Sequence, residues 1–314
     1  MSSSALPADL ENQTYVTVKA IVGGKVWLPI RLALQDSRDE PDDIGAQVPV
    51  FSFLIEHPTR GKTLFDLGIR KNGEGYPPAL QSRVHDLFKA ECPHDVADQL
   101  RAGGVKPEEI DTLILSHLHW DHIGDPSLFP TSEIVMGGDI ETILPTRLYP
   151  QNPRGSIHEL PKANKYTFIN FKDVSSTDFK SVSPLGTFTH AIDFFGDGSL
   201  YLIDTPGHCP GHICALARVA ANTFVFLAGD LCHHREAYDP GVRLIGDRMY
   251  EDIVTARETV TRLVKLNKEW PNVIVILAHE PDRLTEGLPL FPEEITDWVL
   301  KAVEKRRARA QVNT

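Results

Sequence analysis

The chain has 314 residues, and its 32 lysines and arginines against 43 aspartates and glutamates give a formal net charge of −11. Hydrophobic residues make up 41% and charged residues 24%, as in an ordinary folded protein, so disorder and fibrous repeats are excluded. The acidic balance argues against a nucleic-acid-binding protein, because neutralising phosphates requires dense lysine and arginine.

The sequence shows no signal for secretion or membrane insertion. Residues 1–13 contain neither a basic stretch nor an apolar core, so they do not resemble a secretory signal. The strongest apolar run, residues 273–277, is about a third of a membrane-spanning helix. Four cysteines are too few for a disulfide scaffold. We therefore expect a cytoplasmic protein with reduced thiols that binds no membrane.

Short strands dominate the first part of the chain. Two β-hairpins are predicted, the first formed by residues 15–22 and 25–34 around Gly23-Gly24, and the second by residues 48–56 and 62–65. Between the hairpins, polar and proline-containing residues 35–47 predict a loop.

Helices and further strands follow along the chain. Apolar spacing predicts helices at residues 79–90, 95–102, 249–268 and 292–305, and short helical turns at 107–110 and 139–144. Buried strands are predicted at residues 112–115, 187–195, 199–204, 213–219, 223–227 and 272–277. Two strand-rich halves, each closed by helices, predict two sheets packed face to face with helices outside.

We expect one domain spanning residues 1–314. Within it, residues 1–48 form an N-terminal arm and hairpin, and residues from about 144 to 185 form a long insertion. A basic cluster at residues 301–309 is typical of a helix end, where the helix dipole favours cations, and a nuclear-import signal is the alternative.

A histidine-rich hexapeptide follows directly after the predicted buried strand at residues 112–115. It places His117 and His119 on one side of the strand end, and Asp121 and His122 in the loop that follows. Borderline cations such as Zn²⁺ take imidazole nitrogen and carboxylate oxygen, and this segment offers both. We interpret it as the first part of a metal site.

Further ligands are expected where other apolar strands end. His208, Asp230 and His279 each follow a buried strand and a small residue that lets the backbone come close. With the hexapeptide, they make five histidines and two carboxylates, enough for two metal ions that share a bridge.

These motifs resemble those of the metallo-β-lactamase superfamily, from Phe65-Asp66-Leu67-Gly68 through His279. The resemblance implies a four-layer αββα sandwich, with two Zn²⁺ ions, or Mn or Fe in place of one, at the sheet edges. It assigns the ligands as follows: His117, His119 and His208 hold the first ion, Asp121, His122 and His279 hold the second, and Asp230 bridges them. Asp66 matches an acid that orients a ligand histidine.

Two such ions imply a hydrolase. The family mechanism uses a bridging hydroxide that attacks a polarised carbonyl, with Asp121 as proton shuttle and Asp230 beside the reacting centre. The expected substrate is a small cyclic amide or ester, and the protein is expected to form a homodimer.

Residues 115–125 and 204–212 are similar to N-acyl-homoserine lactonases and to a fungal lactonase group. The fungal group includes metallo-γ-lactamases that open benzoxazolinone-type plant lactams, a detoxification reaction. Homoserine lactonases have a catalytic tyrosine three residues after the bridging aspartate, but this chain has His233 there. Tyr238, His233 and His234 are the candidates for the missing proton donor.

Two further expectations concern the surroundings of the metals. Tyr149 and Leu148 of the insertion are candidates for an apolar substrate wall, with a surface excursion as the alternative. His212 is a candidate for a residue that supports a ligand. Polyketide-type thioester hydrolysis and N-acyl-homoserine lactone hydrolysis are alternative activities, and a non-catalytic metal-binding relative is an alternative of a different class.

Overall fold

The computed structural model describes residues 5–172 and 182–312, and in this part of the chain most strands form two six-stranded sheets. The first sheet has the order β1 (Thr17–Pro29), β2 (Gly45–His57), β3 (Gly61–Phe65), β4 (Thr112–Ile114), β5 (Glu133–Gly137) and β8 (Tyr166–Ile169). The second has the order β14 (Val273–Ile276), β13 (Thr223–Leu227), β12 (Ile213–Ala220), β11 (Leu200–Asp204), β10 (Phe188–Asp193) and β9 (Ser183–Leu185). β6 (Leu148–Tyr149) and β7 (Ile157–His158) form a separate two-stranded ladder.

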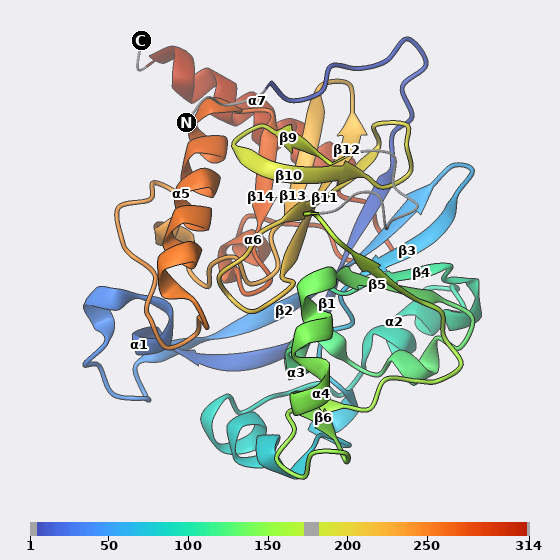
Figure 1. The fold of residues 1–314 in the computed structure, drawn as a ribbon. Helices are drawn as coiled ribbons and strands as arrows, with labels where there is room; N and C mark the ends of the chain where they lie inside the picture. The colour runs from blue at the N-terminus through green and yellow to red at the C-terminus, as the bar shows by residue number, and fades with distance from the viewer. Residues whose placement is uncertain (1–4, 173–181, 313–314) are drawn as a thin grey trace.

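Helices accompany both sheets (Figure 1). They are α1 (Ile30–Ala33), α2 (Val96–Ala102), α3 (Trp120–Ile123), α4 (Leu144–Arg147), α5 (Ile253–Glu269), α6 (Pro281–Thr285) and α7 (Thr296–Val312). In the described part of the chain, no helix is both long enough and apolar enough to cross a membrane.

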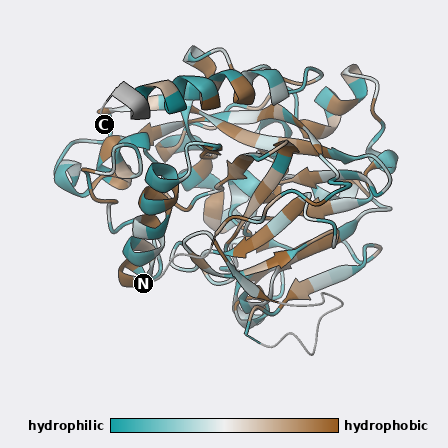
Figure 2. Ribbon diagram, turned by 90° about the horizontal axis from the view of Figure 1, so that it is seen from above, coloured by the Kyte–Doolittle hydropathy of each residue, from teal (hydrophilic) through white to brown (hydrophobic). Residues whose placement is uncertain are grey.

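Three apolar clusters define the layers of the fold. Phe53 and Phe65 of the first sheet pack with Leu202 of the second, so the two sheets meet face to face. Leu100 of α2 packs on the outer side of the first sheet, and Leu263 of α5 on the outer side of the second. Figure 2 shows hydrophobic residues concentrated along the strands between the helices. The predicted αββα sandwich is therefore confirmed.

The first predicted hairpin is wrong. β1 runs through Gly23-Gly24 without turning, and its register with β2 shifts between Val22 and Lys25, which marks a β-bulge. A Cβ atom at Gly23 would lie 2.9 Å from Gly68 Cα, and Gly24 has a φ of +135°. The glycines therefore serve a close backbone approach and a bulge, and the chain turns only after Pro29.

Most other predicted elements are present with shifted ends. The second hairpin is formed by β2 and β3. The predicted helix at residues 79–90 is instead a 3₁₀ turn, Pro78–Leu80, and a π-helical turn, Arg83–Leu87. The helix predicted from residue 249 begins at Ile253, because the Asp252 side chain accepts hydrogen bonds from the backbone N–H groups of the first turn.

The insertion predicted at residues 144–185 lies partly outside the described residues. Its described part contributes β8, which pairs in parallel with β5 and extends the first sheet. β5, β8 and the β6–β7 ladder were not predicted from the sequence. These strands are short, and their pairing depends on neighbours that are distant in sequence.

The strands that carry the candidate ligands end at one edge of the sandwich. β4 leads into Ser116 and His117, and β13 and β14 run parallel and lead into Asp230 and His279. β11 leads through Pro206 into His208. The backbone N–H of Ile213 donates to the carbonyl of Ser116, which connects the two sheets beside these loops. Loops distant in sequence therefore meet at one place.

Candidate metal centre

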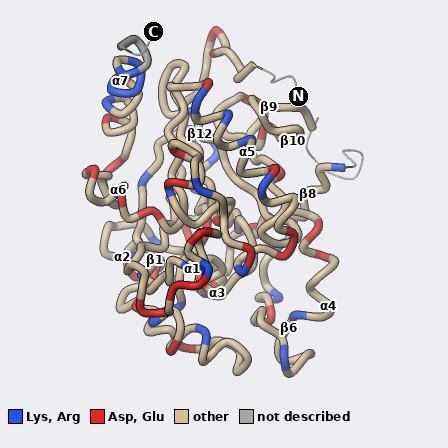
Figure 3. Tube along the Cα trace, turned by 90° about the vertical axis from the view of Figure 1, so that its left-hand side faces the viewer, with Lys and Arg blue, Asp and Glu red and all other residues tan. Residues whose placement is uncertain are grey.

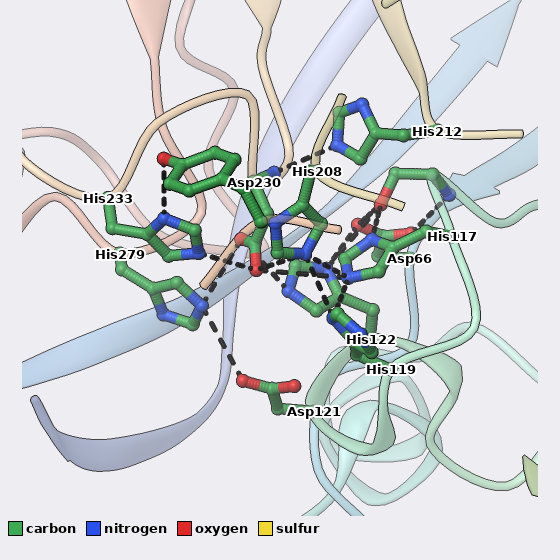
Figure 4. A network of polar contacts seen from close by, with 12 residues as sticks. Asp66, His117, His119, Asp121, His122, His208, His212, Asp230, His233 and His279 are labelled. Atoms are coloured by element: carbon green, nitrogen blue, oxygen red, sulfur yellow. Dashed lines mark hydrogen bonds and ion pairs between the residues drawn. The ribbon is translucent and has the colours of Figure 1, made fainter. Parts of the chain in front are cut away.

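Two groups of ligand atoms face each other where these loops meet (Figure 4). The first contains His117, His119, His208 and Asp230, and the second contains Asp121, His122 and His279. Within each group, one nitrogen or oxygen atom per residue lies within 4.8 Å of all the others. The structure thus brings together all seven residues predicted as ligands.

The imidazole nitrogens of the first group are close together. His119 Nδ1 lies 2.9 Å from His117 Nε2 and 2.9 Å from His208 Nε2. Burial lowers the pKa of His117 and of His208 well below the usual value, and it lowers the pKa of His119 to about 4. At neutral pH these rings are therefore uncharged and each offers a nitrogen lone pair.

The Asp230 carboxylate lies between the two groups. Its Oδ2 is 3.4 Å from His208 Nε2, and its Oδ1 is 3.1 Å from His122 Nε2 and 3.3 Å from His279 Nε2. Burial alone would raise the pKa of Asp230, but the surrounding histidines hold it well below the usual value. This carboxylate is therefore ionised and has one oxygen directed to each group.

The chemistry of this donor set fits divalent metal ions. His122 Nε2 and Asp230 Oδ1 are buried, and neither has a hydrogen bond of acceptable geometry within the described residues. Buried polar atoms without partners are costly unless another group satisfies them. Imidazole and carboxylate ligands at these separations suit a borderline cation in each group. Each group could therefore hold a metal ion.

Asp66 holds the His122 ring. Its Oδ2 lies 2.8 Å from His122 Nδ1, and its two oxygens also accept from the backbone N–H and hydroxyl of Ser116, each at 2.7 Å. Asp66 has a φ of +61°, a strained conformation for an aspartate. A carboxylate on the far nitrogen of a histidine fixes its tautomer and directs Nε2 toward the metal position.

His212 supports Asp230 rather than joining the ligands. His212 Nε2 accepts a hydrogen bond from the Asp230 backbone N–H at 3.1 Å, and its Nδ1 lies 2.8 Å from the Thr205 hydroxyl. Burial lowers the pKa of His212 to about 3, so the ring is neutral and can accept.

His233 contacts the bridging position directly. Its Nε2 lies 3.1 Å from Asp230 Oδ2, and its Nδ1 lies 2.9 Å from the Tyr250 hydroxyl. Tyr250, which no sequence pattern indicates, is close to His208, with ring centroids 5.6 Å apart. Residues 248–250 show no motif, and only the packing of this loop against the metal centre reveals the tyrosine.

The structure does not bring Tyr238, His234 and Tyr149 into the cluster. The Tyr238 hydroxyl is buried, donates to Glu280 at 2.9 Å and accepts from Arg283 at 2.8 Å. His234 accepts from the backbone N–H of Glu236, and Tyr149 lies on β6 beside His158.

A cleft of about 250 Å³ opens onto the metal centre. His119, Asp121, His208 and Asp230 form its floor, and its apolar wall contains Leu80, Phe88, Leu118, Trp120, Met249 and Tyr250. Arg83, Arg248 and Glu251 add charge at the same cleft. The insertion contributes Ser156, whereas Leu148 and Tyr149 are not among the lining residues.

Comparisons with known proteins agree with this geometry. Residues 45–270 match the model of the metallo-beta-lactamase superfamily. The chain is 33% identical to cytochrome P450 monooxygenase mpaDE of Penicillium brevicompactum, over 93% of this chain and 36% of that protein. It therefore spans about a third of the length of that relative. It is 31% identical to metallo-hydrolase mfmC of Annulohypoxylon moriforme, over 81% of this chain and 75% of that protein.

More distant relatives include named enzymes. Gamma-lactamase FDB1 of Fusarium pseudograminearum is 28% identical over 79% of this chain and 70% of its own length. Among solved structures, Bacillus thuringiensis AiiA with N-decanoyl-L-homoserine has a TM-score of 0.68 at 19% identity, over 90% of this chain and all of AiiA. That structural likeness shows the fold. The chain belongs to the metallo-β-lactamase superfamily.

Proposed function

We propose that this protein is a zinc-dependent hydrolase that opens a small cyclic ester or amide. The observation that carries the proposal is the Asp230 carboxylate, whose two oxygens face two separate groups of metal-ligand atoms. His117, His119 and His208 would hold one ion, Asp121, His122 and His279 the other, and Asp230 would bridge them. When bound, two such ions supply an attacking hydroxide near neutral pH and polarise the substrate carbonyl.

The side chains around the two ion positions would transfer protons during the reaction. Asp121 is the most exposed of the ligands in its group, with 12% of its side chain accessible, and it lines the cleft floor. Its Oδ2 is 3.5 Å from His279 Nε2. Asp121 can therefore take a proton from the nucleophile and exchange it with solvent through the cleft.

Tyr250 is the best-placed group to assist the leaving atom. Of the three donors considered from sequence, Tyr238 is engaged by Glu280 and Arg283, and His234 faces a different pocket. Tyr250 lines the cleft, and its hydroxyl lies 2.9 Å from His233 Nδ1. We infer that the Tyr250 O–H exchanges its contact with His233 Nδ1 for a hydrogen bond to the departing oxygen or nitrogen, and that His233 holds the hydroxyl in position until then.

The lining of the cleft supports an aromatic lactone or lactam as substrate. Phe88, Trp120 and Met249 form an apolar wall, and a volume of about 250 Å³ suits a compact ring better than a long chain. Arg83 and Arg248 line the same cleft and have no ion-pair partner among the residues described. They favour a ring that carries a carboxylate or phenolate.

The relatives support the same substrate class. FDB1 is named a gamma-lactamase, and N-acyl homoserine lactonase AttM of Rhizobium radiobacter is 28% identical over 75% of this chain. A γ-lactam and a lactone share a cyclic acyl group and differ in the leaving atom, which is nitrogen in the lactam and oxygen in the lactone. The benzoxazolinone-type aryl lactam of the sequence prediction fits the apolar wall, and polyketide-type thioester hydrolysis remains the alternative.

A panel assay tests the proposal. Hydrolysis of aryl γ-lactones, benzoxazolinones, homoserine lactones, β-lactams and thioesters is measured by proton release, before and after metal removal. We expect turnover of the aryl lactones or lactams, lost on chelation and restored by zinc. Turnover confined to thioesters would overturn the cyclic substrate, and a zinc-loaded protein inert toward every class would indicate a non-catalytic relative. The cytoplasmic location and the homodimer stay predictions.

A further inference from the structure

The basic cluster of α7, which the metal centre does not use, lines a second cavity. This groove has a volume of about 810 Å³ and lies between α5, α7 and residues 235–240. Lys301, Lys305 and Arg309 follow one another at intervals of four residues, so they lie along one face of α7. Figure 3 shows basic residues along this helix. Lys268, at the end of α5, joins them in the groove.

These four cations have no acidic partner in the part of the chain that the structure describes. Lys268, Lys301, Lys305 and Arg309 form no ion pair within residues 5–172 and 182–312. Like charges at a spacing of four residues destabilise a helix. A row of unpaired cations in a chain with a net charge of −11 therefore needs a specific reason.

The helix dipole does not supply that reason. Of the three α7 residues in the row, only Arg309 lies in the last turn of the helix, where the dipole favours a cation. Lys305 lies about one turn and Lys301 about two turns before Arg309, beyond the reach of this effect. The prediction of a helix end rich in cations thus explains only part of the cluster.

Other residues give the groove a built floor. The Arg306 guanidinium donates to the backbone carbonyls of Val273, at 2.6 Å, and Asn267. Glu286, one of two acidic residues lining the groove, is paired with Arg235 at 2.6 Å and Arg283 at 2.8 Å.

Asp239 is the second acidic residue that lines the groove. Basic side chains still outnumber acidic ones there, so the net charge of the lining is positive. The ring of Trp298 adds an aromatic surface to the same groove and lies 5.8 Å from the Arg283 guanidinium carbon. The groove thus combines unpaired ammonium groups, fixed guanidinium groups and the aromatic side chains of Trp298 and Tyr238.

We propose that this groove, defined by Lys268, Trp298, Lys301, Lys305, Arg306 and Arg309, binds a small molecule that carries two or more phosphate groups. Lysine and arginine are the usual phosphate ligands, and a row of cations spaced along a helix matches a chain of linked phosphates. The volume is in the range of small-molecule sites, and a concave groove favours a compact anion over a flat macromolecular surface.

Calorimetric titration of the metal-loaded protein with ADP and with inorganic tripolyphosphate tests the proposal at physiological salt. We expect one molecule bound per chain, and binding at least about tenfold weaker in K305E. R307E is the matched control, because it makes the same charge change on the same helix at an exposed residue that does not line the groove.

The control separates the groove from the metal centre, which also attracts phosphates. Both variants should retain the lactone turnover of the unsubstituted protein, and only K305E should lose the phosphate ligand. Equal weakening by K305E and R307E, or no saturable binding of either probe, overturns the proposal. Binding of an oligonucleotide with no binding of ADP or tripolyphosphate would also overturn it, and would identify a nucleic-acid surface.

Discussion

Asp66 Oδ2 lies 2.8 Å from His122 Nδ1, and this contact connects the end of β3 to the metal centre. A carboxylate behind a ligand histidine fixes its orientation and raises its basicity. In D66N, the His122 ring loses its charged partner, while the residues packed around it stay the same. We therefore expect metal affinity at that half of the centre to fall by about 10- to 100-fold.

Competition with a chelating dye measures that loss. D95N is a suitable control, because Asp95 caps α2, well away from the ligands, by accepting from the Asp98 backbone N–H. If D66N and D95N released metal equally, the support of His122 by Asp66 would be disproved.

If Asp230 bridges the two ions, two variants should differ in the number of metal ions bound per chain. D230N changes the one carboxylate that faces both ligand groups, whereas H279Q changes a ligand of one group. We expect D230N to lose most of both ions and H279Q to lose about one per chain. Elemental analysis after gel filtration measures the content, and it identifies zinc, manganese or iron. Equal metal content in the two variants would contradict a bridging role.

Tyr250 and Tyr238 provide a matched pair of buried tyrosines. In Y250F we expect kcat to fall by about 10- to 100-fold with little change in KM, because the leaving atom loses its hydrogen-bond donor. In Y238F we expect kcat to be unchanged and stability to fall by about 1–3 kcal/mol, because Glu280 and Arg283 lose their shared partner. Steady-state kinetics and thermal unfolding separate the two roles. A fall in kcat in Y238F but not in Y250F would contradict the assignment of Tyr250 as the donor.

The two cleft arginines predict a preference for acidic substrates. R83A and R248A each remove a guanidinium group that lines the cleft. We expect KM for a carboxylate-bearing aryl lactone to rise about tenfold in each variant. The comparison is the matched ester without the acid, whose KM should change much less. A similar rise for both substrates would show that the arginines act through cleft shape alone.

Acid should destabilise the metal-free protein. The pKa of His119 is about 4 and that of His212 about 3, both below the value of about 6.5 in the unfolded chain. As pH falls from about 6.5 toward 4, the unfolded state binds protons that the folded state does not, so stability decreases. Asp204, whose pKa burial raises to about 6, opposes this trend.

Urea unfolding at several pH values measures that dependence. The slope should weaken in H212N, a variant that removes one of these neutral histidines. A free energy of unfolding that stays constant from pH 6.5 to 4.5 would show that these depressed pKa values do not govern stability.

Part of the fold follows from local patterns alone. The second hairpin, α2 and most of the second sheet have strong periodicity and clear end signals, such as the Asp95 cap. The Gly23-Gly24 pair misled the prediction because its signal is shared by a hairpin and a bulge. Only the approach of Gly68 from another part of the chain distinguishes the two.

The sequence by itself determined the ligand types. The hexapeptide from His117 to His122 and the strand ends before His208, Asp230 and His279 place imidazoles and carboxylates where strands stop, and strand ends of packed sheets meet at an edge. Only the tertiary structure decided which groups surround them. Tyr250 reaches His233 and Tyr238 turns to Glu280 because side-chain contacts depend on packing between distant segments, which no local spacing encodes.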